Sequence, residues 1–227
     1  MKKESEQTKA SFGQNLNDFF ANNRFLMIIV VAIVLIGLIG TIITLSVINQ
    51  SKINTNIKAE EIYEKYIEWI QAPEDEKDRK GDELLGMLND ILEKPSKGFA
   101  VQRAYFTKGQ YYLEQEEWGE AAELFHTLGT EYPKSYLAPV SLINAASAYE
   151  MSGDPDKAVE CYETVMENFK DSTSSAPEVC FNLGRLYEEK GDEDSALKYY
   201  ETILSDYSES NWVNAANNRI ISLKLDN

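Results

Sequence analysis

Residues 176–206 read APEVCFNLGRLYEEKGDEDSALKYYETILSD, and this stretch carries the clearest structural signal in the chain. Apolar or small residues recur at helical spacing in residues 180–187 and again in residues 196–203. Side chains three and four positions apart lie on one face of a helix, so the pattern predicts two amphipathic helices. Between them, Gly191 and Asp192 predict the end of the first helix and the cap of the second. Glycine adopts left-handed backbone there, and aspartate accepts free amide hydrogens.

The same pattern occurs twice more upstream, in phase with the first. The second helices are marked by alanines at spacings of 37 and 38 residues: Ala121, Ala158 and Ala196. The first helices each contain a tyrosine three positions after a small residue: Tyr112, Tyr149 and Tyr187. A helical pattern with a period of this length indicates repeats that stack into a solenoid. We therefore predict an all-α solenoid of helical hairpins.

On these residues the chain resembles the tetratricopeptide repeat (TPR) family, whose repeats are helical hairpins of similar length. The resemblance implies that the two helices of each hairpin cross at a small residue, because small side chains let the backbones approach. That position is occupied by Gly109, Ala146 and Gly184.

Other segments complete the predicted domain organisation. Residues 59–99 contain an apolar stripe and predict a degenerate TPR-like helix pair, and the last residues predict a capping helix. The expected divisions are a tail at 1–24, a transmembrane helix at 25–48, a linker at 49–58, the degenerate pair at 59–99, three TPR repeats at 100–210 and the C-terminal capping helix at 211–227.

The stretch FLMIIVVAIVLIGLIGTIITLSVI, residues 25–48, contains no charged side chain. At 1.5 Å per residue it extends about 36 Å as a helix, more than the roughly 30 Å of a hydrocarbon core. The apolar part of a signal peptide is shorter and ends in small residues. Here the run ends in Ser-Val-Ile-Asn-Gln, so we expect an uncleaved transmembrane helix.

Basic residues flank this span on both sides, with a small excess before it. That excess favours a cytoplasmic N-terminus. We therefore expect a single-pass protein of the cytoplasmic (inner) membrane, with the TPR domain on the periplasmic or extracytoplasmic side. The reversed topology would give a cytoplasm-facing scaffold. The residues concerned are Lys2, Lys3, Lys9 and Arg24 before the span, and Lys52, Lys58 and Lys65 after it.

Composition argues against most chemical functions. The chain has 22 basic and 38 acidic residues, a net charge of −16, and would be repelled by nucleic acid. One histidine and two cysteines supply too few ligands for a typical zinc site. Phosphate-binding and hydrolase motifs are missing. We expect no catalytic residues, no cofactor, no metal and no small-molecule substrate. For Cys161 and Cys180, a disulfide and two buried thiols both stay open.

The TPR resemblance implies a concave groove lined by the first helix of each repeat. Such a groove binds proteins or peptide segments. The residues that the repeat phase assigns to it are Arg103, Phe106, Gln110, Leu113, Ile143, Asn144, Ser147, Phe181, Asn182 and Arg185.

A single apolar span followed by an acidic TPR region resembles the ancillary subunit of the bacterial Sec translocon, the YfgM type. This resemblance implies a membrane-anchored scaffold that assists protein export or folding. Its partners would be the translocon, exported clients or chaperones. The alternative is a structural adaptor of an envelope complex, in outer-membrane assembly or cell division.

Overall fold

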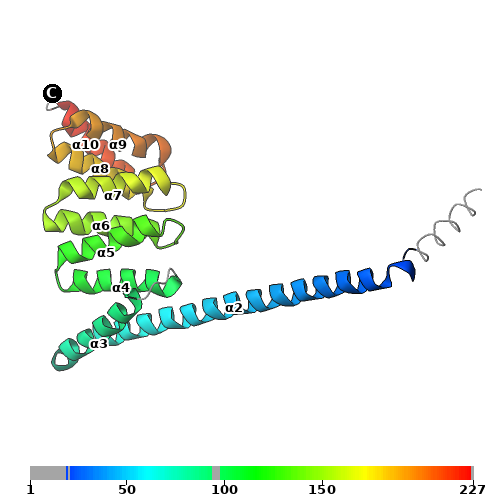
Figure 1. Ribbon diagram of the computed structural model, residues 1–227. Helices are drawn as coiled ribbons and strands as arrows, with labels where there is room; N and C mark the ends of the chain where they lie inside the picture. The colour runs from blue at the N-terminus through cyan, green and yellow to red at the C-terminus, as the bar shows by residue number, and fades with distance from the viewer. Residues whose placement is uncertain (1–18, 20, 94–97, 226–227) are drawn as a thin grey trace, which may run out of the picture. The chain divides into compact units, whose positions relative to one another are not determined.

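The structure is a computed structural model that describes Phe19, residues 21–93 and residues 98–225. Every regular secondary-structure element within these residues is a helix, as expected for an all-α fold (Figure 1). The helices are α2 (Arg24–Ile70), α3 (Glu74–Leu92), α4 (Phe99–Glu114), α5 (Trp118–Glu131), α6 (Ala138–Ser152), α7 (Pro155–Asn168), α8 (Ala176–Glu189), α9 (Glu193–Asp206) and α10 (Val213–Leu225).

The chain divides into two compact units, residues 1–54 and residues 55–227. The first contains the apolar part of α2, the one described helix long and apolar enough to cross a membrane. Residues 49–58, expected as a linker, are helical and belong to α2. They contain no glycine or proline that would stop the helix. Most of the expected tail at 1–24 lies outside the described residues, and the predicted domain boundaries stay predictions.

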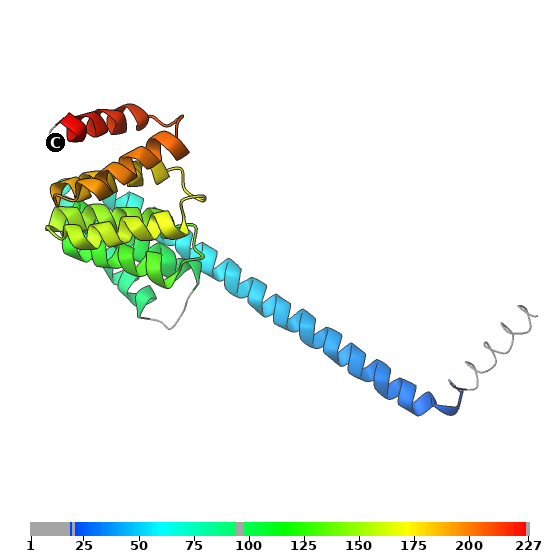
Figure 2. The same cartoon turned by 90° about the horizontal axis from the view of Figure 1, so that it is seen from above.

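The second unit is a run of antiparallel helical hairpins. From α4 to α9, each helix makes its main contacts with the helix before it and the helix after it, and the end helices α3 and α10 contact α4 and α9. Figure 2 shows α9 and α10 side by side at the C-terminal end of this series. Nearest-neighbour packing of this kind is the defining property of a solenoid.

Small residues lie where the two helices of a hairpin cross, as the sequence predicts. A Cβ atom on Gly109 of α4 would lie 2.8 Å from the ring of Phe125 on α5. A Cβ atom on Gly184 of α8 would lie 2.5 Å from the ring of Tyr200 on α9. Both rings are fully buried. The glycines therefore let each hairpin close over a large aromatic side chain.

The turns inside the second and third repeats are also as predicted. Gly153 and Gly191 have φ of 84° and 75°, in the left-handed region. Asp154 accepts a hydrogen bond from the Lys157 amide at 3.3 Å, and Asp192 accepts one from the Ser195 amide at 3.1 Å. Each aspartate thus satisfies an amide that the first turn of its helix leaves free.

The first repeat forms the same turn without glycine, which sequence reasoning missed. Glu116 has φ of 59° and donates its amide to the Leu113 carbonyl at 3.1 Å. Gly153 donates in the same way to the Glu150 carbonyl at 3.0 Å. A side chain is disfavoured in left-handed backbone, so the packing of the repeats imposes this turn on an unsuitable residue.

Replacing Glu116 with glycine should therefore stabilise the protein by about 1 kcal/mol, because the left-handed conformation penalises a Cβ atom by about that amount. The check is the thermal midpoint of the full chain in detergent. The reciprocal variant, Gly191→Glu, should lower the midpoint by a similar amount. A lower midpoint for Glu116→Gly would show that its side chain contributes more than its backbone strain removes.

Candidate protein-binding surface

The ten residues that the repeat phase assigns to the groove all lie on α4, α6 or α8. Ser147 is exposed and the other nine are partly exposed, so none of them belongs to the fully buried core. Because α4, α6 and α8 are the first helices, or A helices, of the three repeats, we refer to these ten positions as the A-helix stripe. The structure brings some of them together and leaves others apart.

The hydroxyl of Tyr162, on α7, is the meeting point of stripe residues from two repeats. The Ser147 hydroxyl lies 3.4 Å from it, and the Asn182 side-chain amide donates to it at 3.3 Å. The Tyr162 hydroxyl also lies 3.3 Å from the Glu150 carboxylate, to which it donates. Residues from α6, α7 and α8 thus form one polar network.

Arg185 extends this network along α8. It donates to the Glu150 carboxylate and, at 2.8 Å, to the Glu189 carboxylate. The Glu150 side chain is 20% exposed and that of Arg185 is 37% exposed. A carboxylate this shielded needs a partner to offset its lost hydration, and the guanidinium supplies it.

A second network repeats the arrangement at the next repeat. The Tyr200 hydroxyl donates to the Glu188 carboxylate at 3.0 Å, and Arg219 of α10 makes two hydrogen bonds to the same carboxylate. Each network joins a glutamate from the first helix of a hairpin, a tyrosine from the second, and an arginine from the helix that follows. We call these two sets the Glu–Tyr–Arg triads.

The first repeat has an apolar version of the triad. The repeat spacing puts Leu113 where the others have glutamate, Phe125 where they have tyrosine and Ser147 in place of the arginine. Phe106 packs edge-on against Phe125, with ring centroids 5.5 Å apart. The triad positions are therefore uncharged at the first repeat and contain an ion pair at each of the next two.

A cleft of about 580 Å³ lies away from the ten predicted positions, where α4 and α6 end and where α5 and α7 begin. Its lining includes Glu123, which accepts hydrogen bonds from the Tyr149 hydroxyl at 3.0 Å and from Lys157 at 3.2 Å. Both bonds lower the pKa of Glu123, while burial and the bond to the carboxylate raise the pKa of Tyr149. Sequence reasoning missed this cleft, because its lining residues serve as repeat and capping positions.

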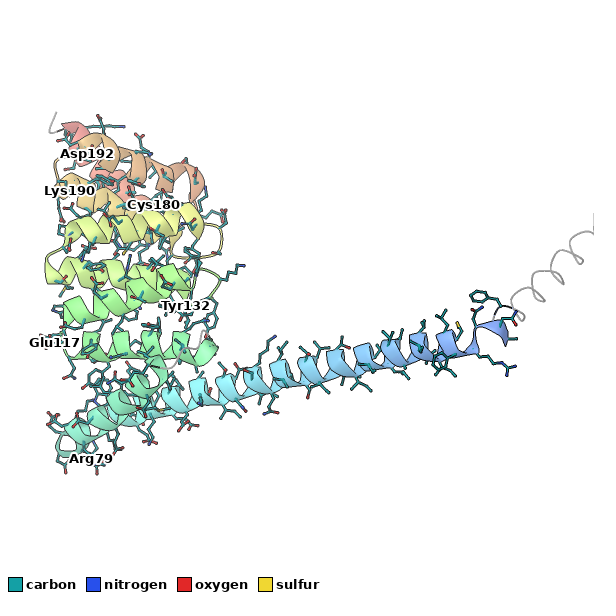
Figure 3. The ribbon with its side chains drawn as sticks, viewed as in Figure 1. Arg79, Glu117, Tyr132, Cys180, Lys190 and Asp192 are labelled. Atoms are coloured by element: carbon teal, nitrogen blue, oxygen red, sulfur yellow. The ribbon has the colours of Figure 1, made fainter. Side chains whose placement is uncertain are left out.

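The described residues offer no evident reaction chemistry. No group of three or more histidine, cysteine, aspartate or glutamate side chains among them could hold a metal ion. Cys161 and Cys180 are free and buried, and burial raises the pKa of each thiol to about 12. They therefore remain protonated and poorly nucleophilic near neutral pH. Cys180, which is labelled in Figure 3, lies on α8. Its sulfur atom is 3.7 Å from that of Met166.

Comparison with known proteins identifies the family of the repeat region. No curated protein matches the chain. The sequence model of the soluble NSF attachment protein family, SNAP, matches residues 88–224, which is more than half of the chain. The match begins within α3 and ends within α10, so it includes both Glu–Tyr–Arg triads and the whole A-helix stripe. The chain therefore belongs to the SNAP family.

Proposed function

We propose that this protein is a membrane-anchored scaffold that binds polypeptide segments along the A-helix stripe. The observation that carries the proposal is the convergence of Ser147, Asn182 and Arg185 on Tyr162 and Glu150. Side chains held by one another present fixed donors and acceptors to a ligand, which reduces the entropy lost on binding. The family match supports the coarser role, because SNAP proteins are helical-repeat adaptors without enzymatic activity.

An extended segment suits the stripe because the stripe changes character along its length. Phe106 and Leu113 of the first repeat, with Ile143 at the start of the second, offer partly exposed apolar side chains. The next repeats offer Asn144, whose amide makes no hydrogen bond to any described residue, and the polar groups of the triads. A polypeptide can match such a surface with an apolar residue at one end and backbone amides at the other.

We further propose that the apolar part of α2 anchors the scaffold in the cytoplasmic membrane. The repeat domain would then face the extracytoplasmic side and assist export or folding beside the Sec translocon. Supporting this are the length and composition of the helix and the basic residues that precede it. The acidic repeat domain would remain soluble and would not bind nucleic acid.

The test is site-specific photocrosslinking with the full chain in membrane vesicles. A photoreactive amino acid replaces Gln110 or Asn144 in the stripe, and Glu160 of α7 or Lys198 of α9 serves as the control position. The probe is reduced, carboxymethylated lactalbumin, a permanently unfolded polypeptide. We expect at least several-fold more crosslinking from the stripe positions than from the controls.

Equal crosslinking from both sets, or none from the stripe, would contradict the proposed binding surface. The anchoring proposal has its own test, protease treatment of intact spheroplasts. Digestion of residues 49–227 without lysis would support the extracytoplasmic placement. Protection until lysis would contradict it and favour the cytoplasm-facing scaffold.

A further inference from the structure

Arg103, on α4, has an unusual environment for a charged side chain. Its guanidinium carbon lies 5.8 Å from the ring centroid of Tyr63, on α2, and 5.7 Å from that of Phe99. Phe99 in turn packs against Tyr136, whose side chain is 66% exposed. Aromatic faces attract a guanidinium and fix its position, while the N–H groups at its edge stay available as donors.

Those donors are not used within the described part of the chain. Arg103 makes no hydrogen bond or ion pair there, and its Nε atom is buried without a partner. A buried donor of a charged group that stays unpaired is destabilising. Its environment therefore fixes a cation without giving it an anion.

The missing anion does not reflect a shortage of carboxylates. Residues 49–227 contain 35 acidic against 18 basic side chains. The other arginines of the repeat domain each pair with glutamate: Arg79 with Glu76 and Glu83, Arg185 with Glu150 and Glu189, and Arg219 with Glu188. Arg103 is the exception, and it lies at one end of the A-helix stripe.

We infer that Arg103 binds a glutamate or aspartate side chain of the partner polypeptide. The inference rests on the proposed function, because it assigns the chemistry of one position in the bound segment. An arginine whose faces rest on rings presents its donors as a planar fork, which matches the two oxygens of a carboxylate. The neighbouring rings of Tyr63, Phe99 and Tyr136 favour apolar or aromatic residues next to that acidic residue.

Charge decides between this ligand and other anions. A nucleic acid or an anionic lipid surface brings many negative charges close to a domain that is itself strongly negative. A polypeptide can bring a single carboxylate, with apolar neighbours, to the one arginine of the described repeat domain that lacks a counterion. The occupant of this site is therefore an acidic residue in an otherwise apolar stretch of polypeptide.

The experiment measures peptide affinity for the full chain in lipid nanodiscs. The probes are peptide pools with the fixed centre Leu-Glu-Phe and random flanks, and matched pools with glutamine or phosphoserine in place of glutamate. We expect the native chain to bind the glutamate pool about tenfold more tightly than the glutamine pool, since hydrogen bonds to a charged group are strong. Arg103→Gln should abolish this preference, and Arg103→Lys should retain part of it.

The matched control is Arg79→Gln, which removes an arginine that already has glutamate partners on α3 (Figure 3). It should keep the full preference for glutamate. Equal binding of the two pools by the native chain, or a preference that survives Arg103→Gln, would overturn the inference and leave the proposed function intact if the stripe still crosslinks to lactalbumin. Tighter binding of the phosphoserine pool would also overturn it. If no peptide pool binds and the stripe does not crosslink to lactalbumin, both the inference about Arg103 and the proposed function are overturned.

Discussion

Gly129→Met is expected to lower the free energy of unfolding by about 3 kcal/mol or more, because added methylenes in a packed core force the surrounding structure to move. Gly129 is buried on α5, and a Cβ atom on it would lie 2.4 Å from Leu142 of α6. Leu142 is itself fully buried and cannot turn toward solvent. Methionine would therefore push α5 away from α6.

The equivalent contact between the next two repeats, where α7 packs against α8, shows which change should relieve the strain. By the repeat spacing, Met166 corresponds to Gly129 and Cys180 corresponds to Leu142. There the large residue lies on the second helix and the small one on the third, with their sulfur atoms 3.7 Å apart. Leu142→Cys alone should lower the free energy of unfolding by about 2 kcal/mol, because the smaller side chain leaves a cavity. The double variant Gly129→Met with Leu142→Cys should recover most of the combined loss.

Thermal and urea unfolding of the full chain in detergent give the four corners of this double-mutant cycle. Gly86→Met is the matched control, since Gly86 is exposed on α3 and nothing lies within 4 Å of its added Cβ atom. Gly86→Met should slightly raise the free energy of unfolding, because methionine has a higher helix propensity than glycine. If the two losses of stability simply add in the double variant, then exchanging the large and the small residue between the facing helices does not relieve the strain.

Glu150→Leu is expected to destabilise the protein by about 2 kcal/mol, because a shielded arginine and a tyrosine hydroxyl lose their acceptor. Arg185 keeps its bond to Glu189, which limits the loss. The Tyr162 hydroxyl keeps only its neutral partners, Ser147 and Asn182. The variant loses stability because one member of a polar network is removed while the remaining members lose a partner.

The apolar triad of the first repeat supplies the compensating change. The triple variant Glu150→Leu, Tyr162→Phe and Arg185→Ser reproduces Leu113, Phe125 and Ser147, and should regain at least half of the loss. Denaturant midpoints measured for the single and triple variants test this. A triple variant less stable than Glu150→Leu would show that the triads contribute through interactions outside these three residues.

Much of the fold could be predicted from local signals. Gly153, Gly191 and the aspartates after them fixed two turns, and the crossing glycines marked the hairpins, since only small residues allow such close backbones. Glu116 could not be predicted, because its turn is imposed by packing against neighbouring repeats rather than by its own preference. The helical state of residues 49–58 differs from the predicted linker, because polar residues are typical of a linker but none of those present breaks a helix.

The positions of the proposed binding surface could be predicted, but the interactions among its side chains could not. The repeat phase gave the ten residues of the A-helix stripe, yet it did not reveal that Glu150 and Arg185 are partners across two helices. In the last triad the arginine breaks the register, because Arg219 follows Arg185 by 34 residues whereas the glutamates and tyrosines are 38 apart. Arg219 reaches Glu188 from about one helical turn earlier on its helix than the repeat would place it.

The Glu–Tyr–Arg triads also restrict how this array can change in length. Each triad takes its members from three successive helices, so it survives only when whole periods are added or removed. Deleting residues 150–187 joins Tyr149 to Glu188 and still leaves Glu188, Tyr200 and Arg219 in their original spacing. A deletion of any other length shifts the new helix out of phase and leaves charged groups facing apolar neighbours. Shortening or duplication of this protein, by recombination or by design, is therefore expected to proceed in steps of one complete repeat.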